Sequence, residues 1–136
     1  MEAKERYTLG AGERLKSRKQ IGLLFSEGRS FSVFPFRVWW ISSLAPLPAL
    51  QSGFSVGNKH FKKATDRNRI KRLMKESYRL QKNELESKLK PGQQQLAVFF
   101  IYAGNEMPEY ETVFAKMGAA LKRLIKIVNE NTAADT

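Results

Sequence analysis

The feature that most constrains the fold is a nearly continuous apolar run from Gln95 to Tyr102. Such a run predicts a strand that is covered on both faces of its sheet. A helix is predicted after it, over Tyr110 to Asn129, because apolar residues recur there along one side. These residues are Val113, Met117, Leu121, Leu124 and Val128. The chain is therefore expected to build a sheet with helices packed on it.

Four more elements are predicted before this run. Lys16 to Glu27 has helical spacing of apolar residues, and Gly28 stands where a helix typically ends. Phe31 to Ser42 is rich in aromatic and β-branched residues, which predicts a strand. After a proline-containing loop, Gly53 to Val56 predicts a second strand, paired with the first as a hairpin. Thr65 to Leu89 predicts one long helix.

The predicted order is α-β-β-α-β-α, an α+β fold (an α/β sandwich) with a small mixed sheet. The last two strands should run parallel because a helix connects them, and the general rule expects a right-handed crossover. The 136 residues suit one domain, which we place at residues 10–129, with flexible tails at 1–9 and 130–136.

The charge of the chain narrows its function. A net charge of +11 favours an anionic partner, either nucleic acid or an anionic membrane surface. The longest apolar runs are too short to span a bilayer, and the N-terminus lacks the apolar stretch of a signal peptide. The absence of cysteine excludes disulfides and thiolate metal sites, and it fits a reducing cytoplasm.

Most of this charge lies in one segment, Lys59 to Lys82, which holds ten Lys or Arg and two acids. A helical projection at about 100° per residue separates an apolar side from a basic side. The apolar side, expected to be buried, holds Ile70, Leu73, Met74 and Leu80. The basic side, expected to be exposed, holds Asn68, Lys71, Arg72, Lys75, Arg79 and Lys82. Thr65 or Asp66 is expected to cap the N-terminus of this helix.

Several other functions would also be compatible with a basic amphipathic helix. A solvated surface helix normally mixes both charge signs, whereas acids are largely missing from this basic side. A helix lying on a membrane needs its apolar side for lipid, but a small domain needs that side for its core. A DNA-recognition helix normally follows a short helix, and here a strand is predicted instead. A general or ribosomal RNA-binding protein would share the same helix and stays an alternative.

The stretch from Ala64 to Arg79, ATDRNRIKRLMKESYR, closely resembles the signature of the bacterial ribonuclease P protein component. That signature places Arg-Asn-Arg, an aliphatic residue, Lys-Arg, a basic-acidic pair and an aromatic on one helix. Leu15 to Gly28 and Gly53 to Val56 resemble the family's first helix and second strand, in the same order. The resemblance extends from about Leu15 to about Val128.

The resemblance implies an architecture and a role. It implies a left-handed β-α-β crossover, against the general rule. It also implies that the chain is a subunit of the ribonuclease P endoribonuclease, whose RNA subunit removes the 5′ leader from precursor tRNA with bound Mg²⁺. The protein would then need no cofactor and no catalytic residues, because the RNA subunit would hold most of the Mg²⁺. No membrane or DNA partner is expected.

Two groups of RNA-binding residues follow from the resemblance. One faces the catalytic RNA: Lys59, Lys63, Arg67, Asn68, Arg69, Lys71, Arg72, Lys75 and Arg79. The other lines a cleft for the single-stranded leader: Arg14, Ile21, Phe25, Arg37 and Trp39. Core packing stays an alternative for Phe25 and Trp39, and it is expected for Trp40, Phe99 and Phe100.

Some positions depart from the family pattern. Ile21 stands where many members have phenylalanine, and Gly57-Asn58-Lys59 replaces the usual Ser-Lys-Lys.

His60 has no partner at metal-ligand spacing, and Asp66 and Glu76 would lie about 15 Å apart on one helix. The sequence therefore contains no catalytic constellation, as expected if an RNA partner is the catalyst.

Overall fold

The computed structural model describes residues 14–15, 18–43, 50–89 and 95–134, with side chains described up to Glu130. The elements are α1 (Arg18–Glu27), β1 (Arg29–Val33), β2 (Phe36–Ser43), β3 (Leu50–Val56), α2 (Ala64–Gln81), α3 (Asn83–Lys88), β4 (Gln95–Tyr102) and α4 (Tyr110–Ala134). The predicted tail 1–9 lies outside the described residues, whereas α4 continues through most of the predicted tail 130–136.

The four strands form one mixed sheet in the order β1-β2-β4-β3. β2 pairs antiparallel with both β1 and β4, while β3 pairs parallel with β4. The predicted α+β class and the predicted parallel pair around a connecting helix are both confirmed.

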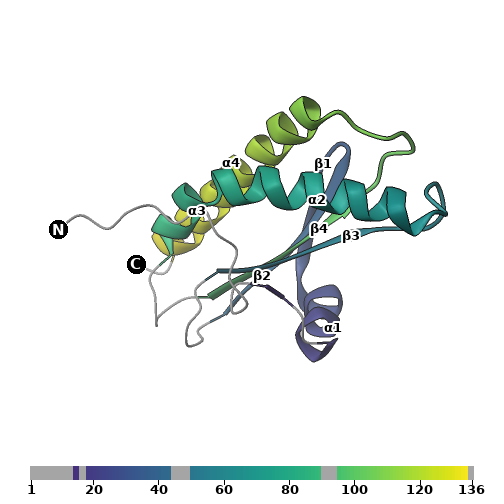
Figure 1. The fold of residues 1–136 in the computed structure, drawn as a ribbon. Coiled ribbons are helices and arrows are strands. Elements are labelled where there is room, and N and C mark those ends of the chain that lie inside the picture. Colours follow the sequence, from purple (N-terminus) through teal and green to yellow (C-terminus); the bar gives the residue numbers. More distant parts are fainter. Residues whose placement is uncertain (1–13, 16–17, 44–49, 90–94, 135–136) are drawn as a thin grey trace.

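The connection from β3 through α2 to β4 is left-handed. In Figure 1 both strands run toward the right, and α2 returns above them. α2 packs on β3, whereas α4 packs on β1 and β2. In this view α2 passes in front of α4, so β3 lies nearer to the reader than β4 does. The general expectation of a right-handed crossover is wrong here, and the family resemblance predicted the hand correctly.

The segment predicted as one strand, Phe31 to Ser42, forms two strands instead. β1 and β2 make an antiparallel hairpin that turns at Phe34 and Pro35, with Val33 opposite Phe36. Proline has no N–H to donate to a ladder, so Pro35 interrupts the strand. The predicted hairpin with β3 is also wrong, because β2 pairs with β1 on one edge and with β4 on the other.

The core lies between one face of the sheet and the helices α2 and α4, while α1 lies on the opposite face (Figure 1). On β4 the even-numbered residues Leu96 to Tyr102 are buried in the core, and the odd-numbered ones are half-buried on the α1 face. β4 is therefore covered fully on one face and partly on the other. The five apolar residues predicted for the buried side of α4 are all buried, which confirms that side.

The long helix predicted from Thr65 to Leu89 is two helices, α2 and α3, which meet at Lys82. Lys82 was expected on the exposed basic side, but its side chain is buried at this junction. Its Nζ lies 3.5 Å from a carboxylate oxygen of Glu86, one turn further on. The junction therefore covers the apolar stem of the lysine and provides an opposite charge for its ammonium group.

The buried side of α2 also differs from the predicted one. Ile70, Met74 and Tyr78 are buried at four-residue spacing, and the Tyr78 ring contacts the rings of Phe54 and Phe100. Leu80 lies off this line and is 39% exposed, so the expectation that it is buried is wrong. Tyr78, which the helical projection did not place on the apolar side, is therefore buried in the core instead of Leu80.

We predict that Met74→Ala lowers the free energy of unfolding by about 2–5 kcal/mol, because it leaves a cavity beneath α2. Leu80→Ala, on the same helix, should cost about 1 kcal/mol or less, because Leu80 is partly solvated in the folded protein. Urea unfolding of the two variants measures both values. Equal losses would show that Leu80 belongs to the core after all.

Candidate RNA-binding surfaces

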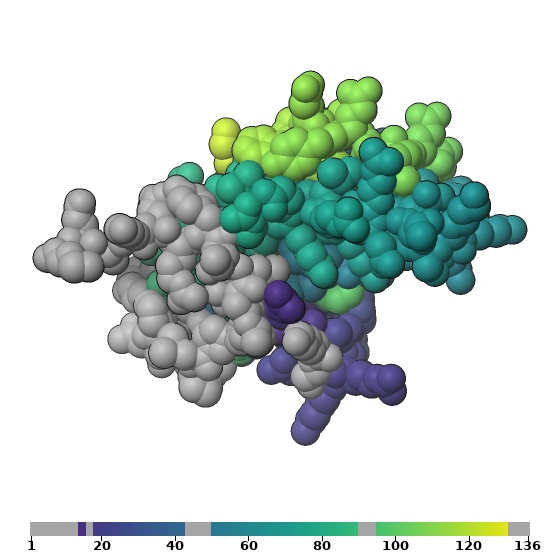
Figure 2. Space-filling view, viewed as in Figure 1, coloured from purple at the N-terminus to yellow at the C-terminus, as the bar shows by residue number. Residues whose placement is uncertain are grey.

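The exposed side of α2 carries cations along its first three turns. Figure 2 shows α2, in teal, uncovered across the near face of the molecule. Six of the nine residues predicted to face the catalytic RNA are exposed here or in the preceding loop. We call these six the α2 surface: Lys59, Lys63, Asn68, Arg69, Arg72 and Lys75.

The start of α2 does not use the predicted cap. The helix begins at Ala64, with Lys63 as its N-cap and no side-chain cap hydrogen bond. The backbone N–H groups of Asp66 and Arg67 donate to the carbonyl oxygen of Lys63. Thr65 and Asp66 already lie inside the first turn, so neither occupies the capping position.

Arg67 ties this end of the helix to the loop before it. Its Nη1 donates to the carbonyl oxygens of Phe61 and Lys62, at 2.7 and 2.9 Å. Phe61 is buried, so the guanidinium bonds to backbone that is anchored in the core. Arg67 is therefore half-buried and positions the loop that carries Lys59 and Lys63.

The basic side of α2 has fewer exposed cations at its C-terminal end than predicted. Arg79 donates through Nε to Glu76 at 3.1 Å and through a second N–H to the other carboxylate oxygen. This hydrogen bonding raises the pKa of Arg79 and lowers the pKa of Glu76. Lys71 is half-buried. The exposed cations of this side are thus concentrated toward the N-terminus of α2.

Three aromatic rings meet on the opposite face of the sheet. The ring centroid of Phe25, on α1, lies 5.2 Å from that of Trp39, on β2, and 5.4 Å from that of Phe99, on β4. Both contacts are edge-to-face, and Trp39 and Phe99 are direct neighbours in the β2–β4 ladder. We call these three residues the aromatic cluster. Phe25 is exposed and Trp39 half-buried, so both lie outside the buried core.

The position of Phe99 corrects an expectation, because core packing was expected for it. Phe100 does point into the core, as does Trp40, and alternation along β4 therefore places Phe99 on the α1 face. Its ring lies over Gly53, where a Cβ atom would come within 2.7 Å of two ring carbons. The parity of residues along the apolar run was the signal that could have identified Phe99.

The indole nitrogen of Trp39 has an unusual environment. Its Nε1 is buried and has no hydrogen-bond partner within the described part of the chain. A buried tryptophan N–H normally finds an acceptor, so among the residues that the structure describes this donor is an exception.

The other residues predicted for the leader border this cluster. Arg37 is exposed two residues before Trp39, on the same face of β2, and Ile21 is half-buried on α1. Arg14 is exposed at the outer edge of β3, where it forms a bridge with Ser52. The structure therefore brings Phe25 and Trp39 into contact and places the remaining three residues around the same face or its edge.

The described ranges contain no group of three His, Cys, Asp or Glu that could hold a metal ion, and His60 is exposed. No helix in the described part of the chain is long and apolar enough to cross a membrane.

These features define a class of protein: a small basic α+β domain with a left-handed β-α-β unit, a cationic helix on one side and an aromatic cluster on the other. The Ribonuclease P family model matches residues 9–125. The chain is 36% identical over 119 residues to the ribonuclease P protein component of Porphyromonas gingivalis, with 87% of each chain covered. The chain belongs to the ribonuclease P protein component family.

Two further comparisons agree with this membership. The ribonuclease P protein component of Chlorobaculum tepidum is 35% identical over 127 residues, covering 86% of this chain and 82% of the relative. The solved structure of the RNase P protein from Thermotoga maritima superposes with a TM-score of 0.63 at 28% identity. That match covers 82% of this chain and 96% of the Thermotoga chain.

Proposed function

We propose that this ribonuclease P protein subunit binds the catalytic RNA through the α2 surface and the 5′ leader of precursor tRNA at the aromatic cluster. The observation that carries the proposal is the division of α2 into two sides. Ile70, Met74 and Tyr78 are used by the core, which leaves the exposed cations free for a partner and leaves no apolar side for a membrane.

The α2 surface suits the backbone of a folded RNA. Arg69, Arg72 and Lys75 are exposed on successive turns, and cations at such spacing can neutralise neighbouring phosphates. Arg67 holds the loop with Lys59 and Lys63 in place before RNA arrives, so less ordering is needed on binding.

The aromatic cluster suits a single strand. Unpaired bases stack on aromatic rings beside basic groups, and Arg37 is exposed next to this cluster.

The protein's part in catalysis would be to hold the two RNAs together and to reduce the repulsion between their phosphates. The RNA subunit would cleave the leader and hold most of the Mg²⁺. The chain has no cysteine, which is compatible with action in the cytoplasm.

A reconstitution assay tests this function. The chain alone should not cleave precursor tRNA, but it should stimulate cleavage by its cognate RNA subunit at low Mg²⁺, where phosphate repulsion is least screened. Rates are measured with and without the protein. If the protein binds RNA but gives no stimulation, the alternative of a general or ribosomal RNA-binding protein is favoured instead.

Arg72→Ala and Arg79→Ala form a matched pair for the α2 surface. Losing Arg72 should lower the slope of log affinity against log salt for the RNA subunit by about 0.7–0.9, which corresponds to one phosphate contact. Losing Arg79 should change the slope less, because Glu76 already shares its charge. An unchanged slope for Arg72→Ala would make α2 a solvated face.

Trp39→Ala should weaken binding of leader-bearing tRNA more than binding of mature tRNA, by about 1–3 kcal/mol for one lost stacking contact. The ratio of the two affinities is the readout, because partial unfolding would lower both alike. Phe34→Ala is the control, since Phe34 is 73% exposed at the β1–β2 turn. Equal losses for both tRNAs would limit Trp39 to a packing role.

A further inference from the structure

A second group of cations lies where α4 passes the β1 edge of the sheet. Arg29 of β1 and Lys122, Arg123 and Lys126 of α4 are all exposed. Within the described residues, none of the four is held in an ion pair. We call them the α4 edge. Because β1 and β3 are the two outer strands, and α2 packs on β3, the α4 edge lies at the opposite side of the sheet from the α2 surface.

The two elements bring these cations together. The guanidinium carbon of Arg123 lies 4.6 Å from the ring centroid of Phe31, a cation–π contact that holds Arg123 against β1. Arg29 is on the same face of β1, two residues before Phe31. Lys122, Arg123 and Lys126 also line a hollow of about 550 Å³, whose wall contains a single acid, Glu130.

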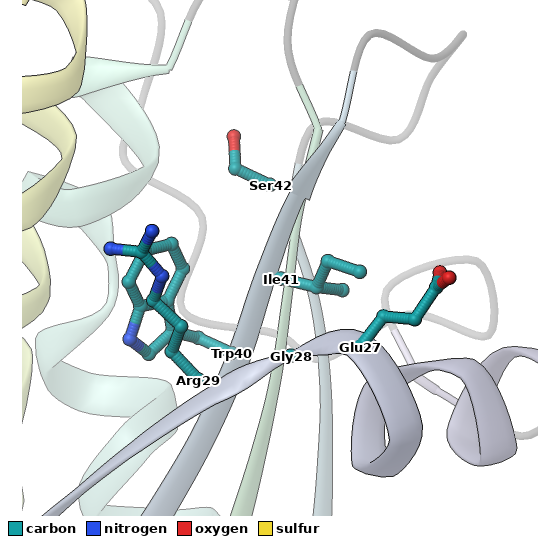
Figure 3. A pocket seen from close by; sticks show the side chains of 6 residues that line it. All are labelled: Glu27, Gly28, Arg29, Trp40, Ile41 and Ser42. Carbon is teal, nitrogen blue, oxygen red and sulfur yellow. The ribbon is translucent and has the colours of Figure 1, made fainter.

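The α4 edge is connected to the face that carries the aromatic cluster. A pocket of about 250 Å³ lies where β1 begins and β2 ends, lined by Glu27, Gly28, Arg29, Trp40, Ile41 and Ser42. In Figure 3 Glu27 and Ile41 lie on the α1 side of the strands, whereas Arg29 and Trp40 lie on the side of α4. Ile41 lies two residues after Trp39 on the same face of β2, and Glu27 lies two residues after Phe25 on α1, so the pocket extends from the neighbourhood of the aromatic cluster to Arg29.

We propose that the α4 edge binds backbone phosphates of the 5′ leader, upstream of the nucleotides that bind at the aromatic cluster. The strand would pass from the aromatic cluster through the pocket in Figure 3, around the β1 edge, to Arg123 and Lys126. This inference rests on the proposed function, because it extends the path of the same leader. It adds a contact that only longer leaders reach.

The test uses the complex reconstituted with the RNA subunit and a series of precursor tRNAs that differ only in leader length. With wild-type protein, affinity should keep rising as the leader grows past the aromatic cluster. The double variant Arg123→Gln with Lys126→Gln should lose this additional rise. Its salt slope for the longest leader should fall by about 1.4, which is two single-strand phosphate contacts at about 0.7 each. Binding of short-leader and mature tRNA should not change.

The matched control is the exchange Arg123→Lys with Lys126→Arg, which keeps both charges and should keep the dependence on leader length. Lys126→Gln alone keeps the contact between Arg123 and Phe31. This single variant therefore tests the α4 edge even if loss of that contact weakens folding in the double variant. The proposal would be overturned if the double variant lost equal affinity for mature and leader-bearing tRNA, or if it bound the RNA subunit more weakly, because the cations would then contact another RNA. It would also be overturned if the variant lost no affinity for the longest leader. Wild-type protein that does not distinguish leader-bearing from mature tRNA would overturn the proposed function as well.

Discussion

The pairing of β4 on both of its edges is the constraint on which the other elements depend. Its backbone bonds antiparallel to β2 and parallel to β3, so it fixes the register of both neighbours. Its side chains alternate between the core and the α1 face, and this alternation places Phe100 under α2 while Phe99 meets Phe25. The position of the aromatic cluster is therefore a consequence of how the core is packed.

The local elements with a strong pattern were predictable from the sequence. β4 has the bounds that the apolar run predicted, and the buried side of α4 follows its helical period. Pairing was not predictable in the same way, because it depends on contacts between distant segments. Pro35 splits a β-rich segment that composition alone describes as one strand, and the partner of β3 lies far along the chain, in β4.

The candidate site shows the same division. The residue types on α2 identified its cations, but the sequence did not show which of them the protein itself engages. Arg67 bonds to backbone, Arg79 bonds to Glu76, and Lys82 is buried at the junction with α3. A helical projection cannot distinguish these cations from exposed ones, because it shows neither where the helix ends nor which loop packs against it. Phe25 and Trp39 were identified only by family resemblance, and Phe99 was assigned to the wrong side.

The adjacent residues Trp39 and Trp40 are the only tryptophans in the chain, and β2 directs them to opposite faces of the sheet. Trp39 contacts Phe25 beside α1, while Trp40 is buried in the core. Removing either one would leave a single tryptophan on a known layer of the molecule, and its emission can be excited selectively over that of the four tyrosines. The emission of Trp39 would then report events at the α1 face, and that of Trp40 the integrity of the interior, without an attached dye.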